Sequence, residues 1–436
     1  MDTLFRNVTA VTLDKYCSVL QNAYVGVETG RICYLGKTPP APEAVGTARV
    51  IDGRGKALLP GLINAHTHLP MTLLRGYADD ADLRHWLFDH VFPAEARMDG
   101  RAVRAGTLLA LAEALASGTV SVSDMYDHCG DIAACVAQSG LKANLSRGVV
   151  CPDGNFDPKT HVGCREAKEL VEAWHGYDEG RIQAEVSIHA EYTSPPPLWE
   201  TLAALAREQG VGMHLHLSET HREHDECLER HGLTPTAVFD RYGVFGTRAT
   251  AAHGVWLTDE DMDLLAARGA SVVHCPVSNL KLASGVARLT ELTARGVNVA
   301  LGTDGAASNN TLDMWEEIKT ACLLAKNRAG APEAFTAPQA FALAVTGGAK
   351  AQGREGETGR IEPGLDADLI LVDFTRPHLT PCHNHISHLA YAVRGGDVTL
   401  TMVRGRVLYE NGVFTTIDLE RARYETEAYA LPKIMG

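Results

Sequence analysis

The chain has 436 residues, which is enough for two or three domains or for one large α/β barrel with additions. Hydrophobic residues make up 45% and charged residues 22%, and this balance excludes wholesale disorder. The formal net charge of −14, from 40 basic and 54 acidic residues, disfavours nonspecific binding to nucleic acid or to an anionic membrane. We therefore expect a small-molecule partner.

The first residues and the cysteines are typical of a cytoplasmic protein. The first twenty residues lack a basic start followed by an apolar run, so we expect no signal peptide. No run of about 18 apolar residues occurs, so we expect no membrane span. The ten cysteines form no CxxC pair, as expected for reduced thiols.

Both ends of the chain have the pattern of short strands interrupted by Gly and Pro. Residues 1–57 contain LFRNVTAVTL and AYVGVETGRICYLG, and residues 353–436 contain ADLILVDF and VTLTMVRGRVLY. Neither end holds enough alternating apolar residues to close a core alone. We expect the two ends to pair into one small β-sandwich domain.

Between these ends, residues 58–352 alternate short apolar segments with amphipathic stretches. Eight units over this length predict a TIM-like (β/α)8 barrel in an α/β fold. The predicted strands are Gly61–Asn64, Thr119–Ser123, Lys142–Ser146, Ile182–Ile188, Val211–Leu217, Ala249–Ala252, Ser271–Cys275 and Val297–Leu301. Titratable residues recur just past the strand ends, where barrel active sites lie.

Four of these residues have the pattern of a metal site. His66 and His68 are two residues apart at a strand end, so both imidazoles can reach one ion. His216 adds a nitrogen and Asp304 a carboxylate. Three His and one Asp suit Zn²⁺ or Fe²⁺ and leave one position for water, which is typical of a catalytic site.

Two further residues can move protons or stabilise charge beside this metal. Glu219 follows His216 by three residues, and we expect it to act as the general acid/base. His253, at the next strand end, is placed to hydrogen-bond the attacking oxygen. Asp304 could also accept a hydrogen bond from the water and so fix its direction.

Five ordered motifs carry a resemblance to a known family. The segments are PGLINAHTHLPMTLLRGYADD, HLHLSE, AAHGVWL, HCPVSNLKL and LGTDGAASNN. They resemble the amidohydrolase superfamily and, more narrowly, its 5-methylthioadenosine/S-adenosylhomocysteine deaminase branch. The resemblance covers nearly the whole chain and implies the same barrel with a small β-domain.

The resemblance also implies an activity and its residues. It implies hydrolytic deamination of adenosine-type nucleosides such as 5-methylthioadenosine, S-adenosylhomocysteine, adenosine or 5′-deoxyadenosine. The metal would be one zinc per subunit, with iron as an alternative, in a homodimer or homotetramer. Glu219 and Asp304 would also contact substrate. The further substrate contacts implied are Glu95 for the ribose hydroxyls, Trp86 beside the nucleoside, and Arg147 and His189.

One departure from the family pattern concerns the loop after the third strand. Some relatives that accept S-adenosylhomocysteine place a second Arg there, facing the amino-acid carboxylate. This chain offers Lys159, His161 or Arg165 instead, so the sequence leaves open which 5′-substituent of the nucleoside substrate is preferred.

Other functions stay open on the same residues. One is hydrolysis of another aminated heterocycle, such as guanine, cytosine or an s-triazine. A two-metal cyclic amidase needs a carboxylated Lys at a strand end, and none of the predicted ends offers one. A scaffold without metal is disfavoured by the intact site positions. We expect His214, His221, His224 and the CHNHISH segment (Cys382, His383, His385 and His388) to be structural.

Overall fold

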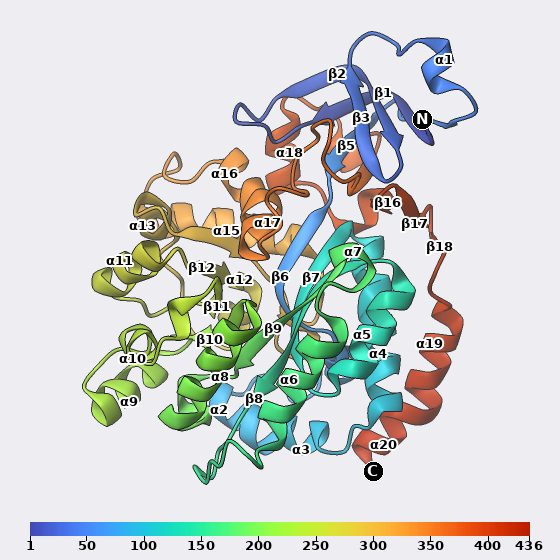
Figure 1. The fold of residues 1–436 in the computed structure, drawn as a ribbon. Helices are drawn as coiled ribbons and strands as arrows, with labels where there is room; N and C mark the ends of the chain where they lie inside the picture. The colour runs from blue at the N-terminus through green and yellow to red at the C-terminus, as the bar shows by residue number, and fades with distance from the viewer.

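The computed structural model describes residues 1–436 and contains a helix-covered barrel and a smaller sheet (Figure 1). The barrel is one parallel sheet in the order β13-β12-β11-β10-β9-β8-β7-β6-β14. Its strands are β6 (Leu62–His68), β7 (Thr119–Tyr126), β8 (Lys142–Val149), β9 (Ile182–Ile188), β10 (Met213–Leu217), β11 (Ala249–His253), β12 (Ser271–His274), β13 (Asn298–Leu301) and β14 (Asp304–Gly305). The predicted barrel fold is confirmed, and all eight predicted strands overlap the observed ones.

The eighth strand of the barrel is broken into two pieces. β13 pairs with β12, whereas β14 pairs with β6 on the other side, so the two pieces together close the sheet. The side chain of Asn64 bridges the break: it accepts a hydrogen bond from the backbone N–H of Thr303 (3.0 Å) and donates one to its hydroxyl (2.7 Å). The break turns the chain so that Asp304 lies next to the end of β6.

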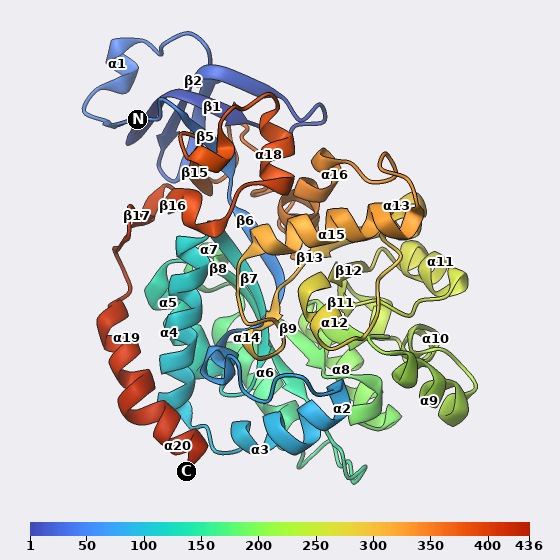
Figure 2. The same cartoon turned by 180° about the vertical axis from the view of Figure 1, so that it is seen from behind.

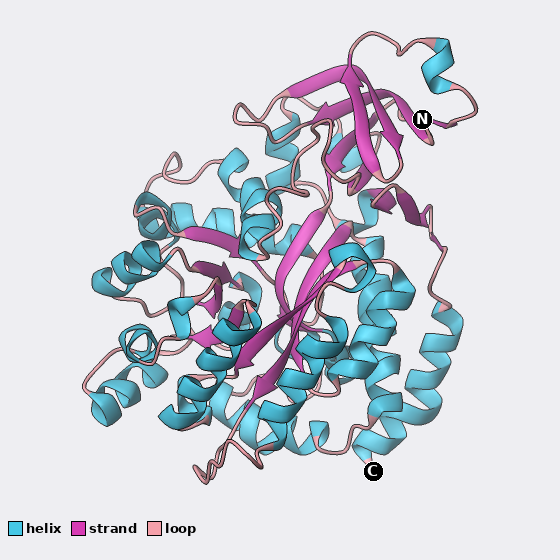
Figure 3. Ribbon diagram, viewed as in Figure 1, coloured by secondary structure: helices cyan, strands magenta, loops and turns pink.

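Helices surround the barrel strands, as Figure 3 shows by colour. Strands covered in this way are buried on both faces, and all eight residues of β7 are buried. The longer helices are α4 (Gly100–Ala116), α5 (Cys129–Ser139), α6 (Val162–Trp174), α8 (Pro196–Gln209), α9 (His221–His231), α10 (Pro235–Arg241), α11 (Asp259–Arg268) and α15 (Met314–Ala329). The shorter ones are α2 (Leu83–His85), α3 (Phe92–Glu95), α7 (Tyr177–Gly180), α12 (Pro276–Lys281), α13 (Leu289–Ala294), α14 (Ala306–Asn309), α16 (Ala337–Ala342) and α17 (Gly348–Ala351). None of the helices combines the length and the apolar composition that crossing a bilayer requires.

The second sheet is built from both ends of the chain, as expected. Its order is β18-β17-β16-β15-β5-β1-β2-β3, and β4 pairs with β1. It encloses its own small hydrophobic core. Its strands are β1 (Thr3–Val11), β2 (Val19–Glu28), β3 (Arg31–Gly36), β4 (Arg49–Asp52), β5 (Lys56–Pro60), β15 (Leu369–Asp373), β16 (Val398–Val403), β17 (Arg406–Glu410) and β18 (Val413–Phe414). The short helix α1 (Pro42–Val45) precedes β4, and α18 (His385–Tyr391), between β15 and β16, packs against α15 and α16 of the barrel.

The domain division predicted from the sequence differs from these elements in two places. β5 belongs to the terminal sheet, so the boundary expected after residue 57 falls inside a strand. The last segment, α19 (Leu419–Glu425) and α20 (Leu431–Met435), leaves the terminal sheet and runs along α4 (Figure 2). Arg101 pairs with Glu425 at 2.7 Å in this contact. The C-terminal residue therefore lies at the opposite end of the molecule from the N-terminus, although the terminal strands pair.

Candidate metal centre and active site

Four side chains from three barrel strands converge at the carboxyl end of the barrel. His66 and His68 come from β6, His216 from β10 and Asp304 from β14, and one ligand atom of each lies within 4.8 Å of the others. All four are buried. Oδ1 of Asp304 lies 3.3 Å from Nε2 of His66 and 3.1 Å from Nε2 of His68. The structure thus brings together the four residues predicted as ligands.

The hydrogen bonds of the imidazoles suit a cation at the centre of this cluster. Nδ1 of His68 donates to the carbonyl of Met125 (2.5 Å), and Nδ1 of His216 donates to the carbonyl of His189 (2.7 Å). In a neutral imidazole the proton on Nδ1 leaves Nε2 as a lone pair, and these two Nε2 atoms lie only 3.3 Å apart. Nε2 of His66 is buried without a hydrogen-bond partner. Three inward-facing nitrogens and a carboxylate match the donor set of a single divalent metal.

The carboxylate of Asp304 is held in one orientation. Its Oδ2 accepts hydrogen bonds from the hydroxyls of Ser278 and Ser308, both at 2.7 Å, which leaves Oδ1 directed at the histidines. Burial opposes ionisation, but the adjacent imidazoles of His66, His68 and His253 hold the pKa of Asp304 well below its usual value. Asp304 is therefore an anion in this site.

Glu219 lies just past β10 and is almost completely buried. Its backbone N–H and that of Ser218 donate to the carboxylate of Glu223, at 2.8 and 2.9 Å. The hydroxyl of Ser284 lies 3.3 Å from Oε1 of Glu219. Burial, and next the charge of Asp304, raise the pKa of Glu219 to about 8. A carboxyl group with such a pKa can hold and release a proton near neutral pH, as a general acid/base must.

His253 is the last residue of the next strand, β11, and lies beside Glu219. Its Nε2 lies 3.7 Å from Oε2 of Glu219, and its Nδ1 lies 3.0 Å from the side-chain amide of Asn279. Burial lowers the pKa of His253. Its neutral imidazole can donate a hydrogen bond towards the space shared with Glu219.

Three residues at these strand ends have left-handed backbone conformations. The φ angles are +47° at Ser218, +74° at His253 and +60° at Asp304. Non-glycine residues rarely adopt such angles, and backbone strain of this kind concentrates at functional sites. His253 and Asp304 are themselves candidate site residues, and Ser218 directly precedes Glu219. The strained backbone therefore lies at the candidate site.

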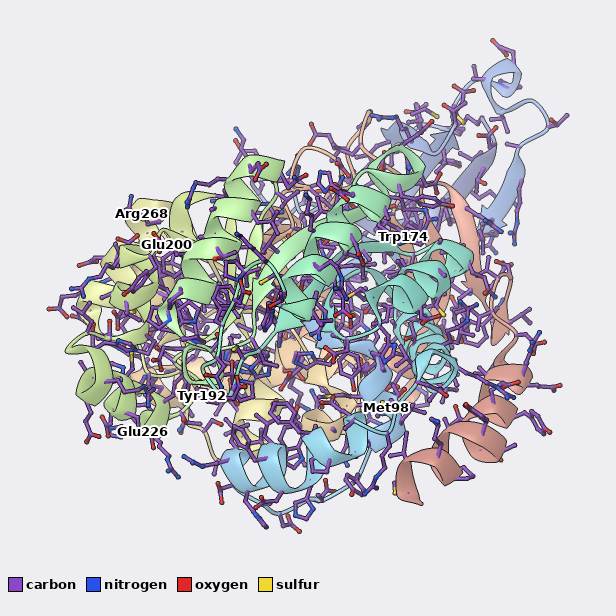
Figure 4. All side chains as sticks on the ribbon, turned by 60° about the horizontal axis from the view of Figure 1, so that its bottom comes forward. Met98, Trp174, Tyr192, Glu200, Glu226 and Arg268 are labelled. Atoms are coloured by element: carbon purple, nitrogen blue, oxygen red, sulfur yellow. The ribbon has the colours of Figure 1, made fainter.

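A cavity of 280 Å³ opens over the cluster. Trp86, Glu95 and His189, which the resemblance assigns to substrate, all line it. Met98 and Tyr192, which are labelled in Figure 4, line it as well. Burial raises the pKa of Glu95 to about 7, and its Oε1 is buried without a partner. Burial also lowers the pKa of His189 to about 3, so this imidazole is neutral.

Arg147 is placed differently from the expectation. On β8, Gly148 lines the cavity, and the side chain of the preceding residue, Arg147, points to the outer side of the strand. There its guanidinium group pairs with Asp127 and, at 2.8 Å, with Glu166. This placement does not fit the expected direct contact with substrate, because side chains alternate along a strand. Lys159, His161 and Arg165 do not line the cavity either.

Comparison with known proteins gives the family. The model of the amidohydrolase family matches residues 57–408. The chain belongs to the amidohydrolase family. This amidohydrolase is 42% identical, over 429 residues and 98% of each chain, to the 5′-deoxyadenosine deaminase of Methanosarcina acetivorans. It is 40% identical, over 98% of each chain, to the 5-methylthioadenosine/S-adenosylhomocysteine deaminase of Pelotomaculum thermopropionicum.

A solved structure agrees with these relatives. An adenosine deaminase from Xanthomonas campestris, with bound zinc, superposes with a TM-score of 0.93 at 34% identity. The match covers 100% of this chain and 99% of the other. The amidohydrolase fold predicted from the motifs is therefore confirmed over the full length.

Sequence reasoning missed several residues that orient the site of this amidohydrolase. Ser278 orients Asp304, and Asn279 orients His253. Both residues lie in the motif HCPVSNLKL, so the sequence contained a signal that could have identified them. Glu223 orients Glu219 from the start of α9, and no motif marked it.

Proposed function

We propose that this amidohydrolase removes the exocyclic amino group of adenosine-type nucleosides by hydrolysis, giving the inosine analogue and ammonia. The observation that carries the proposal is the meeting of the His₃Asp cluster with Glu219 and His253 in one cavity. The printed names of the relatives support it, since these are deaminases of 5′-deoxyadenosine, 5-methylthioadenosine and adenosine.

The metal in this proposal is one zinc ion per subunit, held by His66, His68, His216 and Asp304, with iron(II) as the alternative. The bound zinc in the Xanthomonas structure supports the choice. When bound, such a metal acts as a Lewis acid that makes water nucleophilic at neutral pH.

The protein residues supply the proton movements. Glu219 accepts a proton from the attacking water and delivers it to the ring nitrogen next to carbon 6 of the adenine. His253 donates a hydrogen bond from Nε2 to the oxygen that gains negative charge at carbon 6. Asp304 accepts a hydrogen bond from the water and fixes the direction of attack. The proton of the new hydroxyl group at carbon 6 then passes to the amino group, the C6–N bond breaks to release ammonia, and the carbonyl of the hypoxanthine ring forms.

The cavity lining favours a nucleoside with an uncharged 5′-group. None of its residues is Lys or Arg, and Arg147 is turned to the other face of β8. Apolar side chains such as Phe92, Met98 and Val150 form much of the lining. An amino-acid carboxylate would find no cation to pair with there, and unpaired buried charges are costly. We place Glu95 at the ribose hydroxyls, with Trp86 and His189 beside the nucleoside.

Steady-state kinetics on a substrate panel test the proposal, with metal content measured on the same sample. The panel is 5′-deoxyadenosine, 5-methylthioadenosine, adenosine and S-adenosylhomocysteine, together with guanine, cytosine and an aminated s-triazine. We expect kcat/KM for the uncharged adenosine analogues to exceed that for S-adenosylhomocysteine by about tenfold or more, as one unmet charge costs more than ~1.4 kcal/mol. Faster turnover of guanine, cytosine or the triazine would favour the alternative hydrolases instead.

We also propose that the protein is a cytoplasmic homo-oligomer, a dimer or a tetramer. All ten cysteines are unpaired, which suits a reducing compartment. Light scattering of the purified protein measures the oligomeric state directly.

A further inference from the structure

A row of buried polar side chains continues below the metal cluster, into the barrel interior. It begins at His66, whose Nδ1 lies 2.9 Å from Nε2 of His214 on β10. Both imidazoles are fully buried. Barrel interiors are usually filled by apolar branched residues, so a buried His–His contact on the axis calls for an explanation.

The row continues from His214 to Glu185 on β9. Nδ1 of His214 and Oε2 of Glu185 lie 3.7 Å apart, and neither atom has a hydrogen-bond partner. Oε1 of Glu185 is held by Arg248 and by the side-chain amide of Asn144, both at 2.7 Å. Burial opposes ionisation of Glu185, but Arg248, His214 and Asn144 hold its pKa below the usual value. An anion thus faces the free ring nitrogen of His214.

The chemistry of the row allows one arrangement of protons when His66 binds a metal. A metal on Nε2 of His66 requires the lone pair there, so the proton of this ring lies on Nδ1. That proton is donated to Nε2 of His214, which must then carry its own proton on Nδ1. The Nδ1–H of His214 points at the carboxylate of Glu185. Each donor in the row therefore faces an acceptor.

We propose that His214 and Glu185 are positioning residues that fix the ring orientation and the tautomer of His66 for metal binding. Metal-binding histidines commonly donate their other N–H to a carboxylate or a carbonyl, which orients the ring and raises its basicity. His68 and His216 use carbonyls for this purpose. His66 instead contacts the imidazole of His214, which lies between His66 and the charged carboxylate of Glu185. Glu185 is in turn held by the partly exposed Arg248, at the opposite end of the barrel. The inference rests on the proposed function only in assuming that the cluster binds a metal.

The test compares metal retention in two matched variants. Glu185→Gln removes the charge from the row. Glu191→Gln removes a carboxylate that is equally buried and likewise paired with an arginine, Arg230, but that does not touch the cluster. Each holoprotein is mixed with a chromophoric chelator, and zinc affinity is measured by competition. We expect Glu185→Gln to bind zinc about 10- to 100-fold more weakly, the usual effect of losing such a partner, and Glu191→Gln to match the wild type.

A second readout separates orientation from general stability. With cobalt(II) in place of zinc, Glu185→Gln should shift the visible absorption bands, whereas Glu191→Gln should not. If Glu185→Gln does not fold, Arg248→Gln takes its place. This substitution removes the ion pair that holds the carboxylate of Glu185, and it changes a side chain that is already partly exposed. Equal zinc affinities and unchanged cobalt bands in these variants would overturn the proposal. A wild type that binds metal and deaminates would then still support the proposed function, whereas one that binds none would contradict that function itself.

Discussion

The side-chain amide of Asn279 lies 3.0 Å from Nδ1 of His253, on the ring nitrogen that does not face Glu219. An amide N–H that donates to Nδ1 leaves the ring proton on Nε2. Nε2 is the atom that lies 3.7 Å from Glu219. Asn279 therefore selects the tautomer in which His253 can donate a hydrogen bond into the cavity.

Replacing Asn279 by Ala should lower kcat about 10- to 100-fold, which is the usual cost of losing an orienting partner, and leave KM nearly unchanged. The reason is that the hydrogen bond from His253 matters most once charge develops on the oxygen. Steady-state kinetics on 5′-deoxyadenosine measure both constants. A rise in KM at constant kcat would instead assign Asn279 to ground-state binding.

Replacing Glu219 by Gln should lower kcat by about 10²- to 10⁴-fold, because general acid/base catalysis contributes on that scale. The amide keeps the shape of the side chain but cannot exchange a proton. Metal content should equal that of the wild type, since Glu219 is outside the ligand cluster. The matched control is Glu229→Gln on the exposed face of α9, which should retain full activity. Normal turnover in the Glu219 variant would remove this residue from the mechanism.

The raised pKa of Glu219 also predicts a pH effect on the metal-free protein. Its carboxyl group titrates near 4.5 when unfolded and near 8 when buried beside Asp304. Between these values the folded protein binds the proton more tightly, so the free energy of unfolding falls as pH rises from 4.5 to about 8. Glu219→Gln should lose less stability over this window, as measured by urea unfolding at several pH values. Parallel pH curves for the two proteins would be evidence against the raised pKa.

Removing the metal should abolish deamination and lower the Tm, and adding zinc should restore both. A ligand present at 100 times its Kd stabilises the folded state by about 2.7 kcal/mol. The measurement is activity and thermal unfolding before chelation, after dialysis against a chelator and after titration with zinc or iron(II). Full activity in metal-free protein would be incompatible with the proposed mechanism.

A stability prediction concerns the contact between the barrel and the terminal sheet. The buried ammonium of Lys142 at the start of β8 lies 2.7 Å from Asp366 and 2.6 Å from Asp368, just before β15. Lys142→Met leaves the buried carboxylate of Asp368 without a cation and removes the nearest cation from Asp366, so it should cost about 3–5 kcal/mol in urea unfolding. Lys168→Met, which breaks an exposed pair with Glu172, should cost less than about 1 kcal/mol. Similar costs for both variants would contradict the structural role of Lys142.

Much of the fold and of the candidate site could be predicted because the signals are local. A polar residue directly after an apolar strand is visible in the sequence, and parallel strands bring such residues to one edge. His66, His68, His216 and Asp304 were predicted in this way and converge in the structure.

The remaining features depend on geometry that the sequence does not display. The alternation of side chains along β8 turns Arg147 outward, and the resemblance alone suggested the opposite. Glu223 contacts the backbone of Glu219 only because the chain turns sharply into α9. His214 was expected to be structural, and its contact with His66 depends on how β6 and β10 face each other across the barrel.

The pairing of β5 with β15 has a consequence for synthesis on the ribosome. Pro60 pairs with Leu369, so about 310 further residues must be synthesised before the partner of this edge of β5 leaves the ribosome. At ordinary elongation rates this takes roughly 15 to 60 s. An unpaired strand edge invites association with other nascent chains during that interval. The order of translation thus leaves one edge of β5 open during most of the synthesis of this polypeptide, and this is a segment that chaperone binding would protect.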